Sequence, residues 1–413
     1  MMKRVGVLAL FALFFCHMFP GVSYADNAEV LPKGVSRVSL NGQFYFPVDE
    51  RYDPDGHTED IAADYNAALD SSVFPALAVF EGPPFNLPVA SVGDSVVDFE
   101  FEWQELDFFY QLGVTDRLTV GIHIPYWWNK TDVKEARLDT TNATVGKNVA
   151  MNTLLPLAVP GTVPLTTEDI QNLLGAGLDI NGDGIIDVPG FGYKRFDTWS
   201  NSGLADVEVG FRYQYFKTED WRLAFTGAVR LPTGKVDDPD NLIDTEFGEG
   251  VWAGLFQFQN DYIGIKNLVL NATFRYELKF PDEERLRVPD DVNQPITLNK
   301  EKVDRDRGDV IEFEVEGTYQ FLEGLGFSLL YEFSYMAKDD ISGNLGFNYE
   351  SLEDETRRRS HVAKITLSYS TIPRFQKKKF PVPLEAFVRY RNRFAGKNAM
   401  NSQYIGVGLS VFF

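Results

Sequence analysis

Several common features are missing from this chain of 413 residues. It has one cysteine, Cys16, so no disulfide can form within the chain. Beyond the amino-terminal apolar run, no stretch approaches the roughly 20 apolar residues of a membrane-spanning helix. Basic residues are outnumbered by acidic ones, with 39 Lys and Arg and 60 Asp and Glu. The formal net charge of −21 argues against a nucleic-acid partner.

The amino-terminal segment has the pattern of a secretory signal peptide. Two basic residues precede an apolar run from Val5 to Phe15, and Ala25 ends a small-residue cleavage pattern. A retained membrane anchor is the alternative, but the run is short and no stop-transfer charges follow. We expect residues 1–25 to be removed and residues 26–413 to form the mature protein.

What the chain has in abundance is aromatic residues and period-two alternation. Aromatics make up 14% of it, with 34 Phe and 18 Tyr. In the segment 308–321, Ile311, Phe313 and Val315 alternate with three glutamates, and the carboxyl terminus alternates in the same way. A strand with one apolar face and one polar face is typical of a membrane β-barrel, although a soluble β-sandwich also alternates.

The order of strands and connections favours the barrel. Short turns alternate with long polar loops, which is the arrangement of outer-membrane barrels with periplasmic turns and extracellular loops. The sequence therefore predicts an all-β fold, a transmembrane antiparallel β-barrel of about 12 strands in the outer membrane of a Gram-negative bacterium. The strands are expected near 35–46, 97–112, 116–129, 203–217, 221–232, 247–262, 266–280, 308–321, 325–338, 359–372, 383–395 and 402–413. The long loops are expected at 47–96, 130–202, 233–246, 281–307 and 339–358.

The second expected strand changes parity part-way. Phe99, Phe101 and Trp103 share one parity, whereas Phe108 and Tyr110 have the other. One inserted residue restores a single apolar face, so the pattern predicts a β-bulge near 104–105.

Three stretches resemble a known family. "LGVTDRLTVGIHIPY" (112–126), "GLADVEVGFRYQY" (203–215) and "RLPTGK" (230–235) are similar to the outer-membrane proteins of the meta-pathway of phenol degradation family. The resemblance implies a channel or transporter for aromatic and other small hydrophobic compounds. These motifs are structural turns, so the resemblance transfers no ligand or catalytic residue.

The loop 130–202 contains a calcium-type motif, "DINGDGIID". Oxygen ligands at alternate positions and a glycine at the sixth position match the first nine positions of an EF-hand loop. Gly190 stands where the bidentate glutamate belongs, which indicates either weak affinity or a ligand supplied by another loop. We expect a structural Ca²⁺ site, with an acidic turn that binds no metal as the alternative. The candidate ligands are Asp179, Asn181, Asp183, Ile185 through its carbonyl, and Asp187.

Charged residues on the inward rows predict the lining of the lumen. An acidic column lies on one expected strand and a basic column on another, with further arginines elsewhere. They form either a charged pore with opposing walls or an ion-pair network that fills a narrow barrel. The predicted pore-lining residues are Glu312, Glu314, Glu316, Arg389, Arg391, Arg393, Arg212, Arg222, Arg230 and Arg275.

The loop 47–96 is unusually apolar around "FPALAVFEGPPFNLP". It could fold inward as a plug, form a hydrophobic site for incoming solute, or lie against neighbouring loops or the outer leaflet.

The sequence indicates a channel and not an enzyme. The mature chain has three histidines, and none lies in a recognisable catalytic frame. The expected function is passive uptake of small solutes, including the hydrophobic or aromatic ones that the resemblance implies. The alternative is a closed barrel that serves as a surface-exposed structural or assembly protein. The expected partners are outer-membrane lipid and a small-molecule solute.

Overall fold

A computed structural model of the chain describes residues 27–289 and 296–413. The predicted signal peptide, residues 1–25, lies outside the described residues. Among the described residues, no helix has the length and apolarity needed to cross a membrane.

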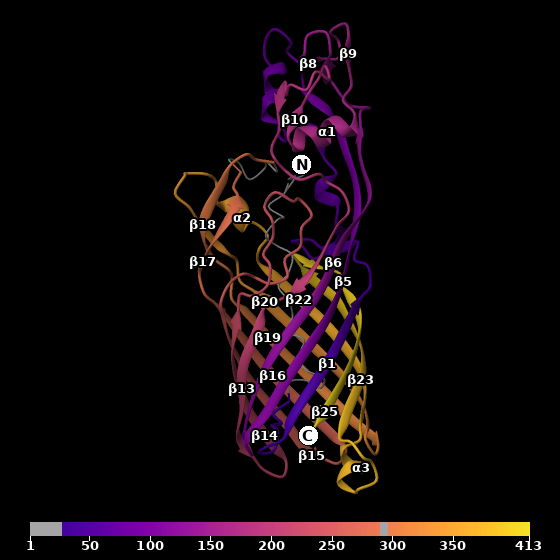
Figure 1. Ribbon diagram of the computed structural model, residues 1–413, viewed down its shortest axis with the longest axis vertical. Coiled ribbons are helices and arrows are strands. Elements are labelled where there is room, and N and C mark those ends of the chain that lie inside the picture. The colour runs from indigo at the N-terminus through magenta and orange to yellow at the C-terminus, as the bar shows by residue number, and fades with distance from the viewer. Residues whose placement is uncertain (1–26, 290–295) are drawn as a thin grey trace.

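The architecture is a closed antiparallel β-barrel (Figure 1). Fourteen strands form one sheet; without the short β4 and β12 at its ends, twelve strands close into the barrel. These strands are β1 (Ser36–Tyr45), β5 (Ser91–Thr115), β6 (Leu118–Asp139), β13 (Val207–Lys217), β14 (Trp221–Leu231), β15 (Ala253–Ile265), β16 (Leu268–Lys279), β19 (Val310–Leu322), β20 (Leu325–Met336), β22 (Arg358–Ser370), β23 (Leu384–Lys397) and β25 (Gln403–Phe412). The predicted fold class and strand number are confirmed.

The last strand closes the barrel against the first. Register runs from Arg37 opposite Phe412 to Tyr45 opposite Tyr404, so both strands are fully paired. Closure satisfies the backbone hydrogen bonds of both strands, which the interior of a bilayer requires. The apolar row of β25, which includes Ile405 and Leu409, is exposed on the outer surface, where lipid would cover it.

Long connections gather at the end of the barrel opposite the carboxyl terminus (Figure 1). The β5–β6 hairpin rises far above the other strands and carries what we call the extracellular head, formed by residues 47–96 and 130–202. The short strands outside the barrel are β2 (Glu50–Tyr52), β3 (Thr58–Asp60), β4 (Ala68–Asp70), β7 (Val145–Asn148), β8 (Thr153–Pro156), β9 (Thr162–Val163), β10 (Gly177–Leu178), β11 (Val188–Pro189), β12 (Trp199–Leu204), β17 (Asp282–Arg287), β18 (Lys300–Asp306), β21 (Asp340–Ser342) and β24 (Ala399–Met400). The helices are η1 (Ala63–Tyr65), η2 (Pro75–Phe80), α1 (Thr167–Leu174), α2 (Glu350–Glu353) and α3 (Ile372–Gln376).

The prediction of a β-bulge near 104–105 is wrong. β5 pairs with β6 without a shift from Phe99 to Gly113, and with β1 from Gln104 to Leu112. The parity changes because the environment changes: Phe108 and Tyr110 face outward at membrane level. Higher up, Phe99 and its neighbours on the same face turn inward and are buried against the head.

The apolar loop 47–96 packs against neighbouring loops. Its Val73, Phe74 and Leu77 join Leu173 and Phe196 of the loop 130–202 in one buried hydrophobic cluster. Burial of this apolar surface is what gives the head a core of its own, outside the membrane. Of the three alternatives for this loop, the structure supports packing against other loops.

Candidate solute pathway

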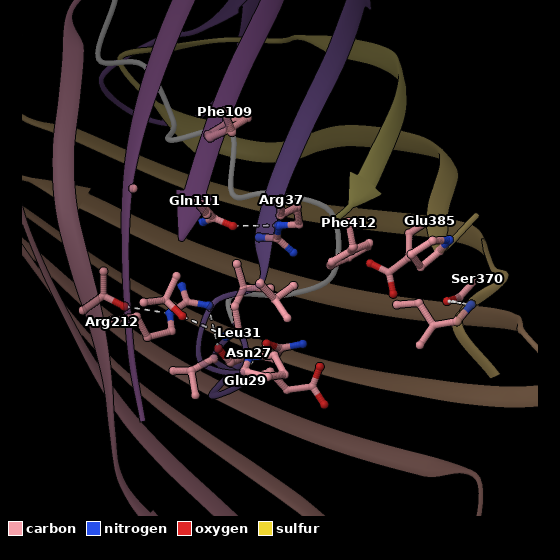
Figure 2. Close-up of a pocket in the computed structure, with 18 of the residues that line it drawn as sticks. Asn27, Glu29, Leu31, Arg37, Phe109, Gln111, Arg212, Ser370, Glu385 and Phe412 are labelled. Carbon is pink, nitrogen blue, oxygen red and sulfur yellow. Dashed lines mark hydrogen bonds between the residues drawn. The ribbon is translucent and has the colours of Figure 1, made fainter. Parts of the chain in front are cut away.

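A cavity of about 950 Å³ occupies the periplasmic half of the barrel (Figure 2). Its lining mixes polar side chains such as Arg37 and Gln111 with apolar ones such as Leu31, Phe109 and Phe412. The Arg37 Nε donates to Gln111 Oε1 at 2.7 Å, and its guanidinium lies 5.9 Å from the centre of the Phe412 ring. A cavity of this size falls in the range of small-molecule sites.

The amino-terminal arm, residues 27–35, runs through this cavity. Ala28 is fully buried; its amide donates to Asp261 Oδ2 at 3.0 Å, and its carbonyl accepts from Gln214 at 2.7 Å. Arg212 donates to the carbonyl of Asn27 at 2.9 Å, while Arg222 pairs with Glu29. The predicted lumen arginines Arg212 and Arg222 therefore hold the arm in place.

Two residues of the acidic column of β19, Glu312 and Glu314, belong to an ion-pair network across the middle of the barrel. The third, Glu316, is buried and accepts a hydrogen bond from Thr318 at 3.1 Å. Arg275 on β16 pairs with Glu312 and lies 2.8 Å from Glu314. Lys364 on β22 joins Glu314, at 3.1 Å, to Glu332 on β20, at 2.7 Å. These groups are almost completely buried, and buried charges are tolerated when they are paired in this way.

A second network lies at the extracellular end of the lumen. Arg230 contacts Glu277 at 2.6 Å and Glu208 at 3.1 Å, linking three strands. Lys279 lies 2.9 Å from Glu249, which also approaches Arg230 at 3.9 Å. Ion pairs therefore occupy much of the lumen, which favours the network alternative for these residues.

The basic column of β23 contacts polar and aromatic partners. Arg389 donates to Thr366 at 3.0 Å, Arg393 donates to Ser360 at 3.1 Å, and the Arg391 guanidinium lies 5.5 Å from the Tyr404 ring. Arg389 and Arg391 are buried inside the barrel.

An aromatic layer separates the charged lumen from the head. Tyr45 lies 4.2 Å from Trp103 and 4.8 Å from Tyr404, measured between ring centres. Below it, His123 stacks on Phe109 at 4.3 Å and lies 3.0 Å from Asp107.

The calcium-type motif forms an exposed turn in the head. Gly182 and Gly184 adopt φ angles of 79° and 87°, and Asp179 accepts hydrogen bonds from both amides, at 2.7 and 2.8 Å. The backbone hydrogen bonds, that of Gly184 first, lower the pKa of Asp179. Asp183 accepts from the amide of Ile185, Asn181 donates to Asp183, and Asp187 accepts from Ile180 and Asn152. Hydrogen bonds within the turn thus hold the predicted ligand residues close to one another.

Sequence reasoning missed several residues of this pathway. Lys279 and Lys364 could have been found, because both have the inward parity of their strands. The arm's position in the lumen and the aromatic layer depend on contacts between distant parts of the chain, for which alternation gives no signal.

Comparison with protein-family models identifies one match. Residues 111–405 match the model of the MetA-pathway of phenol degradation family. The chain belongs to this family. The match extends across most of the barrel, from β5 to β25, and confirms the resemblance seen in its turns. Comparison with curated protein sequences gives no significant match.

Several solved structures are similar to this family member. An outer membrane channel from Pseudomonas putida F1 has a TM-score of 0.54 and 11% identity, with 94% of this chain and 99% of that chain covered. The CymD monoaromatic hydrocarbon channel has a TM-score of 0.35 and 10% identity, with coverage of 92% and 88%. A FadL homologue from Pseudomonas aeruginosa has a TM-score of 0.34 and 10% identity, with coverage of 92% and 90%. The closed barrel and its apolar outer surface place the protein in the outer membrane.

Proposed function

We propose that the protein is a non-enzymatic outer-membrane channel for the passive uptake of small solutes, with hydrophobic or aromatic molecules as its cargo. The family is described by phenol degradation, so membership in it supports an aromatic solute. The similarity to the Pseudomonas putida channel supports the barrel fold alone.

The observation that carries this proposal is the cavity of about 950 Å³ inside a closed barrel. A barrel with a purely structural role has no need of interior space on this scale, and narrow barrels are filled by side chains. The mixed lining suits a molecule with one apolar face, because Phe109 and Leu31 lie beside hydrogen-bonding groups.

Planar-bilayer conductance tests the proposal. Purified, folded protein should give discrete current steps, and the steps should be small because ion pairs and the arm narrow the route. A folded barrel that gives neither current nor solute flux would rule against a channel.

A closed barrel that presents its head is the second candidate. The buried ion pairs of Arg275, Lys364 and Arg230 favour it, since they occupy the lumen between the periplasmic cavity and the head. Such a barrel would be folded, surface-exposed and silent in the bilayer.

We also propose that the turn 179–187 binds Ca²⁺ and fixes the loop 130–202. Support comes from the spacing of the oxygen ligands and from the left-handed glycine at the sixth position. The backbone hydrogen bond from Gly184 lowers the pKa of Asp179, which favours the charged form that binds a cation. Asp183 and Asp187 would supply further carboxylate oxygens.

A further inference from the structure

The extracellular head contains a second cavity, of about 110 Å³. Its walls come from segments far apart in the chain: loop 47–96, α1, the β5–β6 extension and the loop before β15. The apolar side chains that define it include Val73, Phe74, Ile170, Leu174, Phe196 and Leu242.

Polar groups in the wall already have partners, including the charged Asp64, which pairs with Arg51, and Arg137, which pairs with Glu135. Tyr65 donates its hydroxyl to the Leu242 carbonyl at 2.8 Å, and Ser95 donates to the Tyr65 carbonyl at 2.5 Å. Gln171 donates to the Phe196 carbonyl at 3.1 Å and accepts from its amide at 3.0 Å. Because these groups are occupied, the wall offers an incoming molecule mainly dispersion contacts and apolar burial.

The volume limits the ligand to a small molecule. Engineered apolar cavities of about 150 Å³ stay dry and bind benzene. A cavity of about 110 Å³ with the same kind of lining suits a single-ring aromatic molecule, with at most a slight adjustment of its walls.

An aromatic row joins this cavity to the barrel. Tyr65, in the cavity wall, lies 5.2 Å from Phe99 of β5, and Phe99 lies 5.4 Å from Phe101. Trp103 follows two residues later on the same face and contacts Tyr45 at the top of the lumen.

We propose that the head cavity is a binding site for small apolar or single-ring aromatic molecules. The inference rests on the proposed channel function for its purpose, but the binding site can be tested without transport.

Fluorobenzene is a suitable probe, followed by ¹⁹F NMR with purified protein in nanodiscs. Wild-type protein should broaden and shift the resonance in a saturable way. Ala67→Leu and Ala136→Leu, which place extra methyl groups in the cavity wall, should each weaken binding about tenfold or more. Ala78→Leu is the matched control, since Ala78 is an exposed residue of η2 that does not line the cavity. This control should bind like wild type.

Heat-dependent mobility on a gel shows whether each variant folds. If a filling variant does not fold, the isosteric Val73→Thr, which introduces a hydroxyl into the wall, should weaken binding in its place. Absence of saturable binding to wild type, or equal affinities in wild type and the folded wall variants, would overturn the site. Saturable binding without any transport would retain the site and contradict the channel.

Discussion

Phe313 and Glu314 are consecutive residues of β19, yet their side chains lie in opposite environments. Phe313 is 43% exposed on the outer surface, opposite Phe274 of β16, whereas Glu314 is 2% exposed and contacts Arg275 inside the barrel. This alternation decides which substitutions disturb the membrane contact and which disturb the lumen.

Phe313→Lys should destabilise the barrel. A lysine on the lipid face near the middle of the bilayer costs about 2–4 kcal/mol of unfolding free energy. Urea unfolding in lipid vesicles measures the change, and Phe313→Leu serves as the apolar control. Equal unfolding free energies for the lysine and leucine variants would mean that the faces are assigned wrongly.

Glu314→Gln should remove the negative charge with which both Arg275 and Lys364 pair, and so break two buried ion pairs. Breaking a buried pair costs about 3–5 kcal/mol, and the lumen becomes more positive. If the pore is open, its reversal potential in a salt gradient should move toward anion selectivity. Glu102→Gln removes the same charge on the extended β5–β6 hairpin and should change it less. A reversal potential unchanged by Glu314→Gln would indicate that the network lies outside the conducting path.

Neutralising the basic column should act in the opposite direction. Replacing Arg389, Arg391 and Arg393 together with glutamine leaves the lumen more acidic, so cation selectivity should rise at low salt and fade as salt screens the charges. The same bilayer recordings at two salt concentrations measure it. An increase in anion selectivity would contradict the placement of these side chains.

Much of the barrel could be predicted from the sequence, because lipid outside and polar contacts inside impose a period of two. That period assigned Phe313 and Glu314 to the correct faces. It misled at Phe99 and Trp103, because apolar residues also face inward where the head, and not lipid, covers them. The contacts of Ala28 with Asp261 and of Tyr65 with Phe99 join distant segments, and no local pattern encodes them.

Calcium should protect the loop 130–202 from added protease. The double variant Asp179→Ala, Asp183→Ala loses two carboxylate ligands, so its digestion should be the same with calcium and with chelator. Asp197→Ala, which removes an acidic residue of this loop outside the motif, is the control and should keep the protection. Identical digestion of the wild-type protein with calcium and with chelator would mean that the turn does not bind calcium.

The extracellular loop 339–357 should loosen as pH rises. Arg51 forms ion pairs with three carboxylates, those of Glu59, Asp64 and Glu355, at 2.7, 2.5 and 3.9 Å. Burial raises the pKa of Glu355 from 4.5 to about 7. Between those values the folded state binds more protons than the unfolded state, so the stabilisation present at low pH is lost as pH rises toward 7.

Hydrogen exchange of this loop between pH 5 and pH 8 measures the effect, after correction for the intrinsic dependence on pH. Glu355→Gln should reduce the dependence, because the amide remains neutral throughout and only the smaller effect of Asp64, whose pKa burial also raises, is left. A loop that becomes more protected with rising pH would contradict the assignment.

Passive entry of small apolar solutes through this barrel can be measured in whole cells. The measurement is the initial rate of labelled toluene uptake by Gram-negative cells that carry the chain, against the same cells without it. This rate should grow with the amount of folded barrel and persist when the proton gradient is collapsed. Equal rates with and without the chain would contradict passive entry.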